Sequence, residues 1–256
     1  MLQNPDLLSQ GSAAALAARA GVSKATAARF FRRLGYPGSR AAQAEARRGL
    51  TAEARAEWRA RFGPARVGQA QHLTAEVQNL VRSIEQIRSD ELAQSVHALA
   101  RAEKIWVVGF GDNYPLAHLA RALLIRVRPD IRMIPIGGFS VPEEFASIRD
   151  SDAVLALGVG RRTRALRSVM RSSWRAGAHV TLVTDQAARV SPETAHVALR
   201  CRTRGSGVFD SAVAPVSVLT FLCSSMALRI GEPALARLDY IAQIHAEWGD
   251  LLSEDL

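Results

Sequence analysis

Residues 104–113 read KIWVVGFGDN, a short apolar run that ends in Gly-x-Gly and polar residues. Four more apolar runs follow it, namely IRMIPIGG at 131–138, DAVLALGVG at 152–160, HVTLVTD at 179–185 and HVALRC at 196–201. Helical patterns lie between and after these runs, over 115–127, 163–176, 211–230 and 233–252. Apolar runs that alternate with helices are typical of a parallel sheet covered on both faces. Residues 103–256 are therefore predicted to form an α/β domain with a doubly wound, five-stranded parallel sheet.

Glycine-rich loops follow the first and third of these runs, at 109–113 and 158–163. Ligands of doubly wound sheets bind at the carboxyl ends of the strands. Gly-x-Gly at that place lets backbone N–H groups and a helix N-terminus approach an anion. The first loop lacks the third glycine of a dinucleotide fingerprint, and no acidic residue directly follows the second run. We therefore expect an anion site that uses neither NAD nor another cofactor.

The net charge of +9 is concentrated in the first quarter of the 256-residue chain. Residues 1–66 hold 12 Lys and Arg against 4 Asp and Glu, whereas residues 67–256 hold 21 against 20. A basic module joined to a near-neutral domain is typical of a DNA-binding head on a sensing or oligomerising body. A solvated, arginine-rich helical surface would give the same balance, so charge alone leaves both interpretations open.

Composition excludes several other classes of protein. With 48% apolar residues and a mean hydropathy near zero, the chain is not of the disordered class. No run approaches 18 consecutive apolar residues, so we expect no membrane span. The N-terminus lacks a basic region followed by an apolar run, so we expect no secretory signal. Cys201 and Cys223 have no metal-ligand spacing. We therefore expect reduced thiols, no metal site and a cytoplasmic location.

The basic region contains two short helical patterns joined by a glycine, within SAAALAARAGVSKATAARFFRR at 12–33. Ser12 is predicted to cap the first helix, and Ser23 the second, which ends near Gly35. Gly21 is the residue best suited to the positive φ of a tight turn. Small and apolar residues lie where two crossing helices would bury them. This arrangement is the helix-turn-helix pattern.

The second helix of this pattern would enter the major groove of double-stranded DNA. Short polar side chains and a lysine at its start can reach base edges, and the arginines further along can bind phosphates or read guanine. The residues predicted to contact DNA are Ser12, Ser23, Lys24, Thr26, Arg29, Arg32 and Arg33. An ordinary Ala-rich hairpin is the alternative, but the spacing, the turn glycine and the charge all favour DNA binding.

Residues 67–102 are predicted to form a helical connector between the two domains. Apolar side chains recur there at helical spacing, at Leu73, Val77, Leu80, Val81, Ile84 and Ile87, and then at Leu92, Val96 and Leu99. Such stripes usually belong to a core or to the surface of a partner helix. We expect residues 74–101 to join head to body and to contribute to dimerisation.

The segment LAARAGVSKATAARFFRRLGYPG, residues 16–38, resembles the helix-turn-helix of the RpiR family. These are bacterial transcriptional regulators with a C-terminal sugar isomerase (SIS) domain. Family members carry one or two further helices before an Asn-Pro segment, whereas Asn4-Pro5 here follow Met1 almost directly. The DNA-binding domain, 1–66, is therefore expected to be short at its N-terminus. The resemblance implies a homodimer or homotetramer that binds a palindromic operator.

The two glycine loops resemble those of an SIS domain, in which serines and a threonine hold the phosphate of a sugar phosphate. The family pattern is G-x-G-x-S after the first strand and S-x-S-G-x-T in the second loop. This chain keeps the first two glycines and the threonine, but Asn113, Gly158 and Gly160 replace the serines. The residues predicted to bind the ligand are Gly109, Gly111, Asp112, Asn113, Gly158, Gly160, Arg161, Arg162, Thr163 and Ser211.

Two interpretations of the second loop remain open. Arg161 and Arg162 can bind phosphate in place of the lost hydroxyls, because guanidinium groups bind phosphate bidentately. Alternatively, the pocket has decayed and the arginines form a solvated helix start or an oligomer contact. Helix N-termini disfavour cations, so these arginines require an anion or an acidic partner. Residues 207–217, at the start of the helix predicted over 211–230, also resemble segments that cover the ligand in such regulators. Ser211 is a candidate ligand contact there, and Asp210 is expected to cap the helix.

An isomerase of this fold needs a general base over a sugar carbon. The candidates are Glu143, Glu144, His118 and His179, and the sequence forces no pair of them into one site. Because the phosphate-binding serines are also missing, we expect no catalysis. The leading hypothesis is a transcriptional regulator that senses a small anionic metabolite, by resemblance a sugar phosphate. The alternatives are a sugar-phosphate isomerase or binding protein with a vestigial head, and an oligomeric scaffold without a working pocket.

Overall fold

The computed structural model describes residues 23, 25–26, 68–136, 141–207 and 209–249. The chain divides into two compact units, Met1–Val67 and Gly68–Leu256. Two of the predicted DNA-binding residues, Ser23 and Thr26, are among the described residues. The others lie outside them, namely Ser12, Lys24, Arg29, Arg32 and Arg33.

Five strands of the second unit form one parallel sheet in the order β2-β1-β3-β4-β5. They span Ile105–Gly109 (β1), Ile131–Ile134 (β2), Ala153–Gly158 (β3), His179–Asp185 (β4) and Val197–Cys201 (β5). Strands β1 and β3 are buried along their whole length, as strands with helices on both faces must be. The predicted doubly wound α/β fold is confirmed. The strand order reverses between β1 and β3, which is where ligands of such sheets bind.

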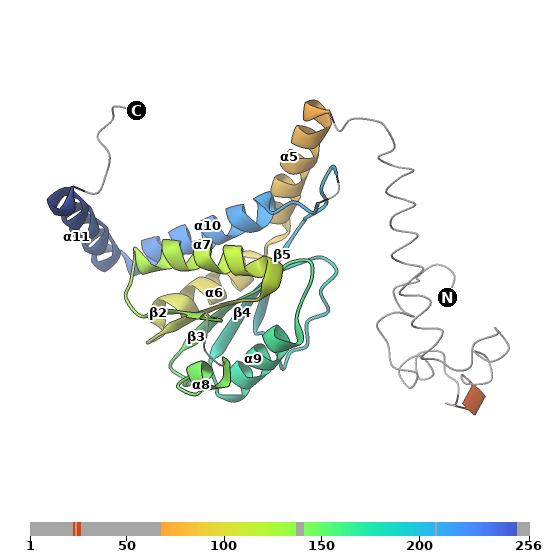
Figure 1. Cartoon of the computed structure of the whole chain (residues 1–256), viewed down its shortest axis with the longest axis horizontal. Coiled ribbons are helices and arrows are strands. Elements are labelled where there is room, and N and C mark those ends of the chain that lie inside the picture. Colours follow the sequence, from red (N-terminus) through yellow and green to blue (C-terminus); the bar gives the residue numbers. More distant parts are fainter. Residues whose placement is uncertain (1–22, 24, 27–67, 137–140, 208, 250–256) are drawn as a thin grey trace. The chain divides into compact units, whose positions relative to one another are not determined.

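Helices cover both faces of this sheet (Figure 1). They are α5 (Gln69–Gln86), α6 (Ser89–Arg101), α7 (Tyr114–Ile125), α8 (Val141–Phe145), α9 (Arg164–Arg175) and α10 (Val213–Ile230). A further helix, α11 (Glu232–Trp248), packs on α10 and projects away from the sheet (Figure 1). Residues of α6, α7 and α10 form one core with every second strand residue, such as Val107. Residues of α9 form the other core with the alternate strand residues, such as Trp106 and Val108. The alternation follows from the two-residue period of a strand.

Among the described residues, α10 has the length and the apolar composition of a membrane-crossing helix. Within this fold, however, one side of α10 is packed into the core, where Val218, Leu219, Leu222 and Met226 are buried. The helix meets α5, α6 and α7 as well as β5. Its apolar composition therefore has an explanation in the core of the second unit.

Helices α5 and α6, which lie in the predicted connector, belong to the second unit. Helix α6 packs on α10 through the buried Val96 and Leu99. Helix α5 packs on the body through its polar face, because the residues that it buries are Glu76, Asn79 and Ser83. Most of its predicted apolar stripe is instead exposed, at Leu73, Val77, Val81 and Ile84.

Candidate functional site

The glycine loops after β1 and β3 lie next to each other, because these strands are neighbours in the parallel sheet. Gly109 ends β1, and a Cβ there would lie 2.5 Å from the backbone oxygen of Asn113, so the turn admits only glycine. Gly160 has a φ of +65°, which L side chains rarely adopt. The two glycines therefore shape a site at the carboxyl edge of the sheet.

Asn113 binds the two loops to each other. It ends the short 3₁₀ helix η1 (Gly111–Asn113) and is buried, with 2% of its surface exposed. Its Nδ2 donates to the carbonyl oxygen of Val159 at 3.0 Å and to that of Arg161 at 3.4 Å. Its Oδ1 accepts from the N–H of Val159 at 2.8 Å. Both ends of this amide are therefore engaged within the protein.

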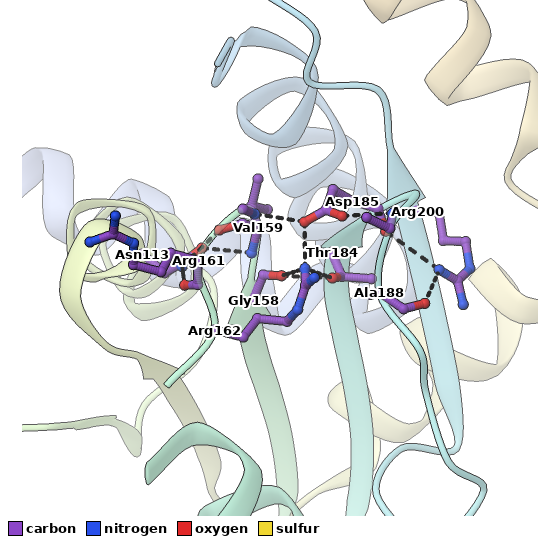
Figure 2. A network of polar contacts seen from close by, with 11 residues as sticks. Asn113, Gly158, Val159, Arg161, Arg162, Thr184, Asp185, Ala188 and Arg200 are labelled. Atoms are coloured by element: carbon purple, nitrogen blue, oxygen red, sulfur yellow. Dashed lines mark hydrogen bonds and ion pairs between the residues drawn. The ribbon is translucent and has the colours of Figure 1, made fainter. Parts of the chain in front are cut away.

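A carboxylate from the neighbouring strand lies against the second loop (Figure 2). Asp185 ends β4, and its Oδ2 accepts from the N–H of Gly160 at 2.6 Å and from Nη1 of Arg162 at 2.5 Å. Its Oδ1 accepts from the N–H of Ala187 at 2.8 Å. Only 9% of the Asp185 side chain is exposed, against 32% for Arg162. The loop thus holds an anion that belongs to the chain itself.

Arg162 lies along the ends of β3 and β4 and contacts both. Beyond its ion pair, Nη1 donates to the carbonyl oxygen of Gly158 at 3.1 Å and reaches Oγ1 of Thr184 at 3.5 Å. The buried Thr184 hydroxyl donates to the same carbonyl at 2.6 Å. The expected need of these arginines for an acidic partner is met, for Arg162, by Asp185.

The remaining predicted loop residues have different surroundings. Thr163 caps α9, because its Oγ1 accepts from the N–H of Leu166 at 3.2 Å. Asp112 and Arg161 are exposed, and the Arg161 side chain points away from Asp185 (Figure 2). The loops thus bring together Asn113, Gly158, Gly160 and Arg162, while Arg161 extends into solvent.

Ser211 contacts α5. Its hydroxyl donates to Oε2 of Glu76 at 2.5 Å and accepts from the N–H of Val213 at 3.1 Å. The expected capping of α10 by Asp210 was wrong: the helix begins at Val213 after Ala212, and Asp210 is exposed. The chain reaches the helix two residues later than the sequence pattern predicts, so the hydroxyl of Ser211 satisfies the first amide.

Ser211 is one of several polar contacts that hold α5 on the body. These contacts join His72 to Ser206, Glu76 to Ser211, Asn79 to Arg204, Ser83 to Arg202 and Gln86 to Arg200. The side-chain oxygen of Gln86 also accepts from Nε2 of Gln186, the residue after Asp185. Arg200 in turn donates to the carbonyl oxygens of Asp185 and Ala188. Hydrogen bonds therefore connect the end of α5 to the second loop.

The candidate general bases do not meet at these loops. His179 lies at the amino end of β4, at the opposite edge of the sheet, and stacks on His196 with ring centroids 4.7 Å apart. Burial, reinforced by His196, lowers the pKa of His179 to about 4. His118 is exposed on α7 and packs edge-on against Tyr114. Glu143 and Glu144 lie in the short helix α8.

The described residues contain no group of three or more His, Cys, Asp or Glu side chains that is placed to hold a metal ion. Both cysteines are free thiols, and burial raises the pKa of Cys201 and of Cys223 to about 12. Such thiols are protonated at neutral pH and unreactive.

Asp185 and Thr184 belong to the site but were not predicted from the sequence. The signal was present, because both residues end an apolar run that follows the second glycine loop. Carboxyl ends of neighbouring parallel strands share one edge of the sheet. A polar pair at the end of β4 therefore lies beside the loop that follows β3.

No protein-family model matches the chain, and no curated protein matches it. Among solved structures it is similar to the sugar isomerase domain of an RpiR transcription factor from Sphaerobacter thermophilus, at 26% identity and a TM-score of 0.62, over 68% of this chain and 97% of that one. It is also similar to Vibrio vulnificus NanR in complex with ManNAc-6P, at 17% identity and a TM-score of 0.65, over 96% and 90%.

A third similar structure is a Methanococcus jannaschii protein with an inferred 3-hexulose-6-phosphate isomerase function. It shares 10% identity and a TM-score of 0.51, over 66% of this chain and 95% of that one. The fold is thus similar both to a domain of a transcription factor and to a protein with an inferred isomerase function. The described part of the second unit has the fold of the sugar isomerase (SIS) domain.

Proposed function

We propose that the chain is a cytoplasmic transcriptional regulator that binds DNA through residues 1–66. In this proposal the SIS fold of the second unit binds a small anionic metabolite of the sugar-phosphate class. The observation that carries the proposal is that a segment whose sequence predicts a basic helix-turn-helix is joined in one chain to an SIS fold. The RpiR protein from Sphaerobacter thermophilus, whose sugar isomerase domain has a similar fold, is a transcription factor.

The start of the second helix of the motif supports the DNA-binding role. Ser23 Oγ accepts from the N–H of Thr26 at 3.1 Å, and residues 25 and 26 are helical. This is the contact of a serine that caps a helix. It agrees with a helix that begins where the motif requires, with Ser23 and Thr26 at the end that would enter the major groove.

The position of the two loops supports the ligand-binding role. They lie at the strand-order reversal of the sheet, where ligands of doubly wound folds bind. NanR, whose fold is similar, is complexed with ManNAc-6P. We propose that a ligand anion binds between the loops through the backbone of Gly160 and the guanidinium of Arg162. Arg161, which is exposed beside them, would contact the rest of the ligand.

The exposed apolar stripe of α5 supports assembly into a dimer or tetramer. Leu73, Val77, Val81 and Ile84 keep 40–63% of their surface exposed on one helix. An exposed apolar stripe of this kind marks an interaction surface, and we propose a second copy of the chain as its partner.

Light scattering should show a dimer or larger for the wild type. Val77→Glu with Val81→Glu should yield monomers, and Gln78→Glu, at an exposed position of α5 beside the stripe, should not.

Helix α5 also offers a route from ligand to DNA. It begins two residues after the end of the first unit, and its other end bonds to Gln186 and Arg200 beside the second loop. A ligand that moves this loop would move contacts of α5. Such a shift changes DNA binding only if the ligand prefers one of two arrangements of the subunits.

The test is binding of the full chain to DNA from upstream of its own gene, measured by fluorescence anisotropy over a salt series. A regulator should bind that DNA at least about 10³-fold more tightly than random DNA. The slope against salt should show several phosphate contacts. Arg29→Ala with Arg32→Ala should weaken binding, while Arg175→Ala, at an exposed position at the end of α9, should leave it unchanged. Equal affinity for both DNAs would refute the proposal.

An isomerase remains the second candidate, because one similar structure carries an inferred isomerase function. The locations of His179 and His118 argue against it, since neither is at the loops. Incubation of the protein with hexose and pentose phosphates, followed by NMR, tests this directly. Isomerisation that disappears in Glu143→Gln would favour the enzyme over the regulator.

A further inference from the structure

The second loop has the donors of an anion site, and those donors are already in use. The N–H of Gly160 and Nη1 of Arg162 both donate to Oδ2 of Asp185. Figure 2 shows the contact between Arg162 and Asp185. The N–H of Val159 is taken by Asn113. A phosphate bound at this loop would therefore compete for the same groups.

Asp185 is well placed to hold this position. Its other carboxylate oxygen accepts from the N–H of Ala187, and the side chain is nine-tenths buried. Its charge is balanced by Arg162, so the pair is neutral before any ligand arrives. A phosphate and a carboxylate cannot both occupy these donors, since two anions a few ångströms apart in a partly buried site repel each other strongly.

We propose that Asp185 is a specificity-determining residue of this site: its carboxylate fills the anion position of the loop, and a phosphate binds only by displacing it. The inference rests on the proposed anion-binding function of the two loops and names how that binding is controlled. Asp185 also supplies the acidic partner that an arginine beside a helix N-terminus requires. Displacement would free Arg162 for the phosphate and turn Asp185 away from the loop.

The experiment compares the full-length wild type with Asp185→Asn by calorimetric titration with inorganic phosphate and with glucose 6-phosphate. Asparagine keeps the shape of the side chain and can accept from Gly160, but it removes the competing charge. We expect Asp185→Asn to bind phosphate at least about tenfold more tightly than the wild type. Asp239→Asn, which removes an exposed acid on α11, should bind like the wild type.

Two further variants locate the effect. Arg162→Ala in the Asp185→Asn background should lose the gained affinity, because the phosphate then lacks its guanidinium. Asp185→Ala serves if Asp185→Asn fails to give a folded protein by circular dichroism, and it should show the same gain. A gain that survives Arg162→Ala would place the phosphate elsewhere and overturn the inference.

The outcomes also separate this inference from the proposed function. Equal phosphate affinity of the wild type and both Asp185 variants overturns the inference, while a sugar phosphate that still changes DNA binding would leave the regulator intact. A large gain in Asp185→Asn, with DNA binding that no sugar phosphate changes, would support the inference and refute the sensing role.

Discussion

The hydrogen bonds of Asn113 are predicted to hold the two glycine loops together, and Asn113→Ala tests this. The substitution removes the hydrogen bonds to the carbonyl oxygen and the N–H of Val159, at 3.0 and 2.8 Å, and the weaker bond to Arg161. A hydrogen bond contributes about 1 kcal/mol net, and a partly buried group left without a partner costs more. We therefore expect the free energy of unfolding to fall by about 2–3 kcal/mol.

For a unit of this size, each kcal/mol shifts the Tm by about 2–4 °C, so the Tm should fall by about 4–12 °C. Differential scanning calorimetry of the full chain measures it. Asp112→Ala is the matched control, because Asp112 is exposed on the adjacent position of the same loop. A Tm for Asn113→Ala within about 1 °C of the control would show that the hydrogen bonds of Asn113 do not stabilise the loops, and would refute the prediction.

Three more predictions concern the frame around the site. Arg128 donates to the carbonyl oxygens at the end of α6, those of Leu99, Ala100, Ala102 and Glu103. Arg128→Met should therefore lower the free energy of unfolding, measured in urea, by about 2–4 kcal/mol. The control Arg121→Met, at an exposed site, should lower it by less than about 0.5 kcal/mol. The pKa of His179 is about 4 in the fold and 6.5 when unfolded, so the unfolded chain binds more protons between these values. The free energy of unfolding should therefore fall by about 1–2 kcal/mol as the pH is lowered from about 6.5 to 4, because the His179 ring is partly exposed and solvent weakens the effect. Urea titrations across this pH range measure the fall, which should be smaller in His179→Asn. Gly109→Ala should reduce the Tm by several degrees, because its Cβ would lie 2.5 Å from a backbone oxygen, whereas Gly68→Ala, with open space around it, should not.

The sheet and its helices could be predicted from the sequence because their signal is local. Each strand is a short apolar run such as IWVVG or AVLALG, and each is followed by glycine or polar residues. The positions of the two loops follow from the same pattern, since parallel strands place their carboxyl ends at one edge. The predicted element boundaries differ from the structure by a few residues at helix ends, as at α10.

The internal anion and the orientation of α5 could not be predicted in the same way. Asp185 meets Gly160 and Arg162 only because β4 pairs with β3, a contact between residues more than twenty positions apart. The periodicity of α5 revealed an apolar stripe but not which face packs on the body. The polar face packs there because the distant segment 200–211 offers carbonyl oxygens, an N–H group and hydroxyls to it.

The response of DNA binding to a sugar phosphate tests the central claim most directly. The measurement is the affinity of the full chain for its upstream DNA, by fluorescence anisotropy, with and without each of a panel of hexose 6-phosphates. We predict that at least one of them changes the affinity by about fivefold or more. We also predict that Asp185→Asn responds at a concentration about tenfold lower. Specific DNA binding that no sugar phosphate alters, in either protein, would contradict the account.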